Sequence, residues 1–145
     1  MTLDPVLPLA TSFGIGAALQ QSGAAAVVSQ GLVSLAQGDP WLSLALIFLA
    51  TALLTALATN NVAAVLMFPI ALATATEMQV SLLPFAVTIM VAASASFATP
   101  IGYQTNLMVY GAGGYRFRDY LLFGTPLTLL VGLVTVVVVP WVWQF

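Results

Sequence analysis

Charge is what this 145-residue sequence has least of, because charged residues make up only 4% of it. A soluble domain carries about 25% charged residues, so a water-covered surface is not expected here. Hydrophobic residues amount to 61% of the chain and the mean hydropathy is +1.10. This composition predicts an all-α integral membrane protein that crosses the bilayer several times.

Cysteine and histidine are both absent. Without cysteine there is no disulfide, thiolate metal site or cysteine nucleophile, and without histidine there is no imidazole base or ligand. Most enzyme chemistry is thereby excluded, and we do not expect an enzyme. Two basic and four acidic residues give a net charge of -2, which leaves no basic patch for nucleic acid. Residues 1–5 lack the basic region of a cleaved signal peptide, so none is expected.

The few charges mark the loops between apolar stretches. The stretches at about 41–58, 62–76, 80–97 and 120–143 contain no charged residue. All charges lie outside them, at Asp4, Asp39, Glu77, Arg116, Arg118 and Asp119. The two arginines predict a cytoplasmic loop before the last stretch, because positive residues are enriched on that side of the membrane.

Three segments have a simple interpretation. Residues 6–20 are apolar but short, which predicts part of a membrane helix. In residues 22–37, serine and glutamine recur at steps of three, four or seven, which predicts an uncharged amphipathic helix in the membrane interface. That helix is expected to stop at Gly38-Asp39-Pro40. Residues 119–143, with aromatic residues at both ends, predict an ordinary transmembrane helix.

The segment 41–76 carries three hydrogen-bonding side chains, Thr59-Asn60-Asn61, in the middle of an apolar run. Its roughly 36 residues are too few for two full crossings with a loop and many for one. Two half-length helices in a re-entrant hairpin are therefore expected, with these residues at the tip. Backbone at membrane depth leaves the helix only where it is buried in protein or lines a watery cavity, so such a tip implies a site. The alternative is one tilted helix whose polar patch binds neighbouring helices.

The segment 80–111 is apolar overall but contains "TPIGYQTN" near its middle. Pro100 lacks an amide proton and its ring clashes with the preceding turn, and Gly102 is flexible, so we expect the helix to break here. Asn106 is expected to cap a short second half-helix that runs to Gly111.

Two interrupted helices would bring helix N-termini to the middle of the membrane, where partial positive charge and free amides suit an anion. Carbonyl groups at the ends of the preceding helices, with Thr and Asn oxygens, suit a small cation such as sodium. The apolar segments contain no Asp, Glu, Lys, Arg or His, which favours sodium over proton coupling. The pattern predicts secondary transport of a small anion.

The stretches "ATNNVAAVLMFPIALA" and "ASASFATPIGYQTNLMVYGAGGYRFRDYLLFGTPL" resemble the C-terminal half of the divalent anion:sodium symporter family. This family contains the sodium/sulfate and dicarboxylate carriers of the ion transporter superfamily. The resemblance covers most of the chain. It implies one inverted-repeat half with an interfacial helix, a re-entrant hairpin, a broken transmembrane helix and a final transmembrane helix. It also implies Na+ as the coupling ion and no other cofactor.

The resemblance assigns roles to particular residues. The implied substrate contacts are Asn60, Asn61, Thr99 and Pro100. The implied cation contacts are Thr59, Asn60, Ala98 and Asn106. The tip reads Thr-Asn-Asn where the family has Ser-Asn-Thr, and Ile101-Gly102 replaces the Pro-Asn usual in dicarboxylate carriers. These departures favour a sulfate-like anion over a dicarboxylate.

A member of this family has two repeats, whereas this chain holds about one. The resemblance therefore implies a missing N-terminal repeat, a partner that supplies it, or a second, oppositely inserted copy in a homo-oligomer. The expected surroundings are the lipid bilayer of a bacterial inner (plasma) membrane. Two alternatives stay open. One is a citrate or arsenite carrier from another branch of the superfamily, and the other is a non-transporting membrane subunit or fragment whose polar groups only pack helices.

Overall fold

The computed structural model describes residues 6–145, and the part of the chain that it describes is helical without strands. The first five residues, on which the expectation about a signal peptide rests, lie outside the described range. The helices are α1 (Val6–Gln21), α2 (Ala24–Leu35), α3 (Pro40–Leu57), α4 (Asn60–Met78), α5 (Leu83–Ser94), α6 (Gln104–Ala112) and α7 (Phe117–Val142). By length and composition α3, α4 and α7 can each cross a membrane. The predicted all-α membrane class is confirmed at this level.

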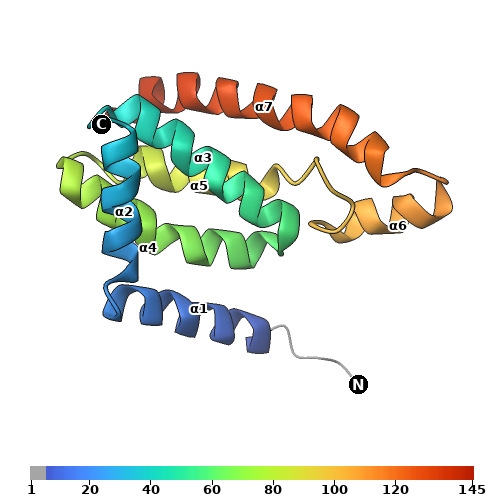
Figure 1. The fold of residues 1–145 in the computed structure, drawn as a ribbon, viewed down its shortest axis with the longest axis horizontal. Helices are drawn as coiled ribbons and strands as arrows, with labels where there is room; N and C mark the ends of the chain where they lie inside the picture. Colours follow the sequence, from blue (N-terminus) through green and yellow to red (C-terminus); the bar gives the residue numbers. More distant parts are fainter. Residues whose placement is uncertain (1–5) are drawn as a thin grey trace.

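Most of the helices lie along one direction. Figure 1 shows α3, α4, α5 and α7 running roughly lengthwise, with α2 across them near the end at which α3 begins. α1 packs beside α4, on the side away from α7. α6 extends the molecule at the opposite end from α2.

The core lies between α3, α4 and α5. Leu44, Ile47, Met67, Phe85 and Ile89 come from these three helices and each is at most 2% exposed. Because lipid is as apolar as these side chains, the core is stabilised by close van der Waals packing more than by removal from water. The three helices therefore form one packed unit.

The start of α3 follows the signal in the sequence. Pro40 occupies the first helical position, and the carboxylate of Asp39 accepts a hydrogen bond of 2.7 Å from the backbone N–H of Trp41. An aspartate at this position satisfies a donor that the helix itself leaves without a partner. The stop and turn expected at Gly38-Asp39-Pro40 thus begin the next helix.

The hairpin helices are longer than the half-length helices expected from the sequence. α3 has 18 residues and α4 has 19, and only Ala58 and Thr59 connect them. Each helix is long enough to cross a membrane, so the expected half-length is wrong, while Thr59 of the expected tip does lie between the two helices. Because the connection is so short, nearly the whole segment is available for helix.

The polar residues of α2 are not all exposed. Ser29, one of its polar residues, is fully buried, and its hydroxyl donates a hydrogen bond of 2.9 Å to the carboxylate of Glu77 near the end of α4. Gln30 is exposed. The polar stripe of α2 therefore includes a contact that ties this helix to the end of the hairpin.

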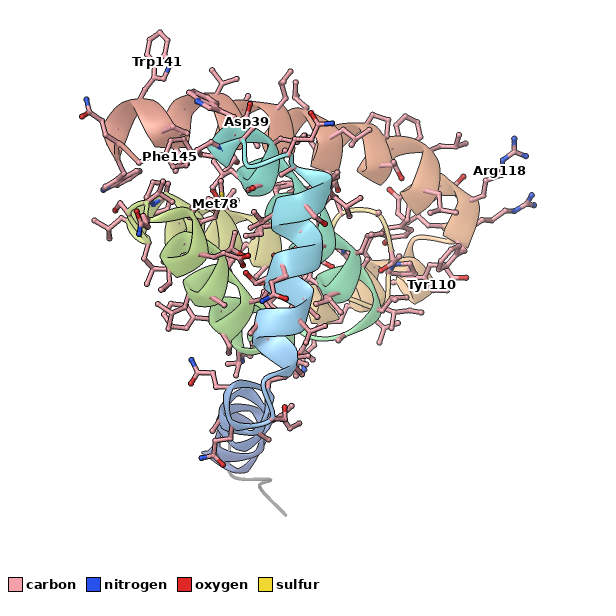
Figure 2. The ribbon with its side chains drawn as sticks, turned by 60° about the vertical axis from the view of Figure 1, so that its left-hand side comes forward. Asp39, Met78, Tyr110, Arg118, Trp141 and Phe145 are labelled. Carbon is pink, nitrogen blue, oxygen red and sulfur yellow. The ribbon has the colours of Figure 1, made fainter. Side chains whose placement is uncertain are left out.

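The two ends of the molecule differ in their side chains. Figure 2 shows Arg118 pointing away from the helices at the end that also holds Tyr110. Near the other end of α7, the ring of Phe145 lies 6.0 Å from the ring of Trp41 and 6.0 Å from that of Phe85, measured between centroids. Phe145 thereby joins the end of the chain to the start of α3 and to α5.

α5 and α6 are separated by the non-helical residues 95–103, and α7 packs closely against this break. A Cβ on Gly124 of α7 would collide with the backbone carbonyl group of Phe97. A backbone atom cannot turn aside as a side chain can, so only glycine permits this approach.

We expect Gly124→Ala to lower the melting temperature of the detergent-solubilised full-length protein, because α7 must move away from the break. Gly111→Ala is the matched control, since its added Cβ meets no atom within 4 Å and alanine favours the helix by about 1 kcal/mol over glycine. Equal melting temperatures for the two variants would contradict the close packing of α7 on the break.

Candidate functional site

The connection between α3 and α4 is built by Thr59. Its backbone is extended, with φ -79° and ψ 155°, and its hydroxyl accepts a hydrogen bond of 3.4 Å from the N–H of Val62. Threonine is a preferred residue at this capping position. Asn60 and Asn61 are consequently the first two residues of α4, at its N-terminus.

The end of α3 is satisfied by side chains of the break. The carbonyl oxygen of Thr55 accepts a hydrogen bond of 3.2 Å from the Ser96 hydroxyl, and that of Ala56 accepts one of 2.6 Å from the Thr99 hydroxyl. Carbonyl groups in the last turn of a helix have no partner within the helix. The hydroxyls of the break therefore act as the C-terminal cap of α3, from residues about 40 positions later in the chain.

The end of α5 receives the reciprocal contact. Thr55 Oγ1 donates a hydrogen bond of 2.8 Å to the carbonyl oxygen of Ala93, whereas Thr51, one turn earlier, bonds back to Ile47 of its own helix. Thr55 Oγ1 also lies 2.9 Å from the side-chain Oδ1 of Asn60. A hydroxyl has one proton, so Thr55 cannot donate to both Ala93 O and Asn60 Oδ1. Exchanging the oxygen and nitrogen of the Asn60 side-chain amide lets Asn60 donate to Thr55 while Thr55 donates to Ala93 O.

Asn106 fastens the break internally. Its side-chain amide donates hydrogen bonds of 2.8 Å to Ser96 O and 3.2 Å to Thr99 O. The backbone carbonyl oxygen of Asn106 accepts a hydrogen bond of 2.9 Å from the hydroxyl of Tyr120 on α7. The expectation that Asn106 caps α6 was wrong, because the capping residue is Tyr103 and Asn106 is the third residue of the helix. Its amide is drawn instead to carbonyl groups that the break leaves without helical partners.

Gly102 lets the break approach the end of α3. The residue is buried, and a Cβ there would collide with Ser96 Oγ and with the carbonyl oxygen of Thr55. The same contact that excludes a side chain thus brings the start of α6 beside the start of α4.

A cavity of about 350 Å³ lies where the two helix starts meet. Its walls are Thr59, Asn60 and Asn61 from the hairpin and Gly102, Tyr103, Gln104 and Thr105 from the start of α6. None of these residues is charged. No side chain caps the N-terminus of α6, so its first backbone N–H groups are available to a ligand.

The sequence-based candidates fall into two groups. Thr59, Asn60 and Asn61 line this cavity. The others lie behind it: Pro100 is buried, Ala98 and Thr99 line an apolar cavity of about 320 Å³ between α3 and α7, and Asn106 lines one of about 400 Å³ between α6 and α7.

Tyr103 and Gln104 are cavity residues that the sequence argument missed. The sequence pattern predicts the start of the second half-helix at Thr105 and Asn106, but α6 begins at Gln104. The available signal was their position directly after Pro100 and Gly102, where a restarting helix must have its first residues.

Neutral oxygens are the possible cation ligands near this cavity. The described residues contain no group of three acidic, histidine or cysteine side chains that could hold a metal ion. A cation here would meet threonine and asparagine oxygens and backbone carbonyl groups, which suit sodium.

We expect Thr99→Val to lower the free energy of unfolding of the full-length protein by about 1–3 kcal/mol, because the change leaves Ala56 O without its partner. Thr76→Val is the control, since Thr76 is exposed and bonds only to Leu72 O of its own helix. Thermal unfolding in detergent measures both. A shift for Thr99→Val no larger than for Thr76→Val would show that this hydrogen bond does not hold the break against the hairpin.

Comparison with known proteins finds membrane transporters, in agreement with the long apolar helices. Residues 4–144 match the citrate transporter family (CitMHS). Sodium/sulfate cotransporter 1 of Chlamydomonas reinhardtii is 42% identical over 125 residues, which are 85% of this chain and 14% of that protein. An uncharacterized transporter of Synechocystis is 44% identical over 133 residues, which are 91% of this chain and 22% of that protein. An uncharacterized transporter of Escherichia coli (strain K12) is 40% identical over 129 residues, covering 88% of this chain and 21% of that protein.

The chain thus spans less than a quarter of the length of these three relatives. The family match, in contrast, extends over nearly all of the chain, and three of its helices are long and apolar enough to cross a membrane. The chain is an integral membrane protein and belongs to the citrate transporter family, a family of the divalent anion:sodium symporter type.

Proposed function

We propose that this chain forms half of the site of a secondary transporter that couples the movement of a small, sulfate-like anion to sodium. The observation that carries the proposal is the meeting of two helix N-termini, those of α4 and α6, at one neutral polar cavity.

The two helix starts make this cavity suitable for an anion. Each helix N-terminus carries about half a positive elementary charge and points backbone N–H groups outward. The cavity adds amide side chains from Asn61 and Gln104, and no carboxylate opposes them. A site built from neutral donors binds an anion and still releases it, as transport requires.

Sodium is the coupling ion in this proposal. The cavity contains no Asp, Glu, Lys, Arg or His to carry a proton, whereas threonine and asparagine oxygens are present. One relative is named a sodium/sulfate cotransporter, which supports both the cation and the anion. Thr59, Asn60, Ala98 and Asn106 remain the proposed surroundings of the cation, with backbone carbonyl groups as the ligands at Ala98.

The hairpin of α3 and α4 is proposed to be re-entrant. Leu57 at the end of α3 lines one cavity with Leu121 and Thr125 of α7, so the tip stands roughly 6–12 Å inside the start of α7 at about 1.5 Å per residue. Figure 1 shows α6 extending beyond the tip. A polar tip at this depth is tolerated where protein or water covers it.

The remaining part of the site is proposed to come from another repeat. The cavity is bounded here only by the starts of α4 and α6 among the described residues, and the relatives are several times longer than this chain. A second repeat or a second copy would complete the cavity. α2, which crosses the other helices in Figure 1, is proposed to lie in the interface of a bacterial inner membrane.

The test is uptake of radiolabelled sulfate into proteoliposomes that contain the full-length transporter, with and without a sodium gradient. We expect sodium-dependent uptake that Asn61→Ala reduces about tenfold or more, the effect of losing one hydrogen bond to a charged group. Gln30→Ala, an exposed residue of α2, is the control and should leave uptake unchanged.

Excess succinate, citrate or arsenite in the same assay identifies the anion class. Competition by one of these alone would replace the sulfate-like anion in the proposal. Equal uptake by Asn61→Ala and the unmodified protein would remove the cavity from the transport path.

A further inference from the structure

We propose that Gln104 contacts the transported anion directly and sets the size of anion that this cavity accepts. This inference rests on the function proposed above and adds a residue to it.

The polar groups around the cavity are of two kinds. Asn60, Thr99 and Asn106 have their side chains in hydrogen bonds with Thr55, Ala56 O, Ser96 O and Thr99 O. Thr99 holds the break to the hairpin, Asn106 ties α6 to the break, and Asn60 is bonded to the Thr55 hydroxyl, so none of them can donate to an anion without losing that contact. These three residues hold the cavity together more than they offer it donors.

Gln104 belongs to the other kind. It is exposed, it lines the cavity, and within the described part of the chain its side chain makes no hydrogen bond. An unpaired primary amide facing a cavity has two N–H donors and one oxygen acceptor available. The position therefore supplies a group that is free to bind.

The location of Gln104 suits an oxyanion. It is the first residue of α6, so its side chain stands beside the backbone N–H groups of that helix start. Asn61 lines the same cavity from the start of α4, so the two amides belong to separate helices on its walls. An anion between the two amides would accept hydrogen bonds from both sides. The width of the gap between the amides depends on the length of the side chain at position 104.

Side-chain length and charge at position 104 can be varied separately. Gln104→Leu keeps the approximate size and removes the donors, Gln104→Asn keeps the amide but shortens it by one methylene, and Gln104→Glu keeps the shape but adds a negative charge. Gln30→Leu is the control, since Gln30 is also exposed and lies on α2, away from the cavity.

In proteoliposomes with the full-length transporter, we expect Gln104→Leu to raise the apparent KM for sulfate about tenfold or more, with a smaller change in maximal rate. Gln104→Glu should abolish sodium-driven sulfate uptake by repulsion. Gln104→Asn should retain uptake but raise the ratio of thiosulfate to sulfate uptake, because thiosulfate is larger. Gln30→Leu should match the unmodified protein.

Unchanged KM in Gln104→Leu together with an unchanged thiosulfate ratio in Gln104→Asn would overturn the inference while leaving the proposed transport intact. Failure of the unmodified protein to take up any anion with sodium would instead overturn the proposed function.

A second measurement does not depend on transport. The chain has no cysteine, so Gln104→Cys introduces a single thiol into this segment, and sulfate should slow its modification by a membrane-impermeant maleimide. Modification at the same rate with and without sulfate would contradict a direct contact.

Discussion

Backbone groups that leave a helix within an apolar protein need hydrogen-bond partners, and the structure depends on how the hairpin and the break supply them to each other. The Thr55 hydroxyl donates a hydrogen bond to a carbonyl group at the end of α5, and the Ser96 and Thr99 hydroxyls donate to carbonyl groups at the end of α3. An unsatisfied backbone group in lipid costs several kcal/mol. The exchange therefore fixes the two interruptions at the same level of the molecule, and the starts of α4 and α6 follow from it.

The same constraint divides the polar residues by task. Hydroxyls and amides beneath the cavity donate hydrogen bonds to carbonyl groups of the interrupted helices. Gly102 and Gly124 allow the close backbone approach around the break. The proposed anion ligands are the N–H groups of the two helix starts and the side chains of Asn61 and Gln104. Most polar residues near the site thus build it, and a few free groups are left to bind.

The sequence predicted the features that depend on neighbouring residues. The Gly38-Asp39-Pro40 stop, the interruption around Pro100 and the family resemblance all rest on local patterns, and the family is confirmed. The interruption begins earlier than expected, because α5 already ends at Ser94. Features that depend on distant partners were not predictable in this way. The buried Ser29 donates a hydrogen bond to a carboxylate 48 residues later, and Asn106 turns to the break rather than to its own helix. A local pattern specifies that a side chain is polar but not which carbonyl group will reach it.

The proposed anion site lies where the starts of α4 and α6 meet. The most direct test is a crystal structure of the full-length transporter with selenate, a sulfate analogue whose anomalous scattering locates it. We expect an anomalous peak within hydrogen-bond distance of Asn61 and Gln104. A peak held by Arg116 or Arg118, or one that lies away from both helix starts, would contradict it.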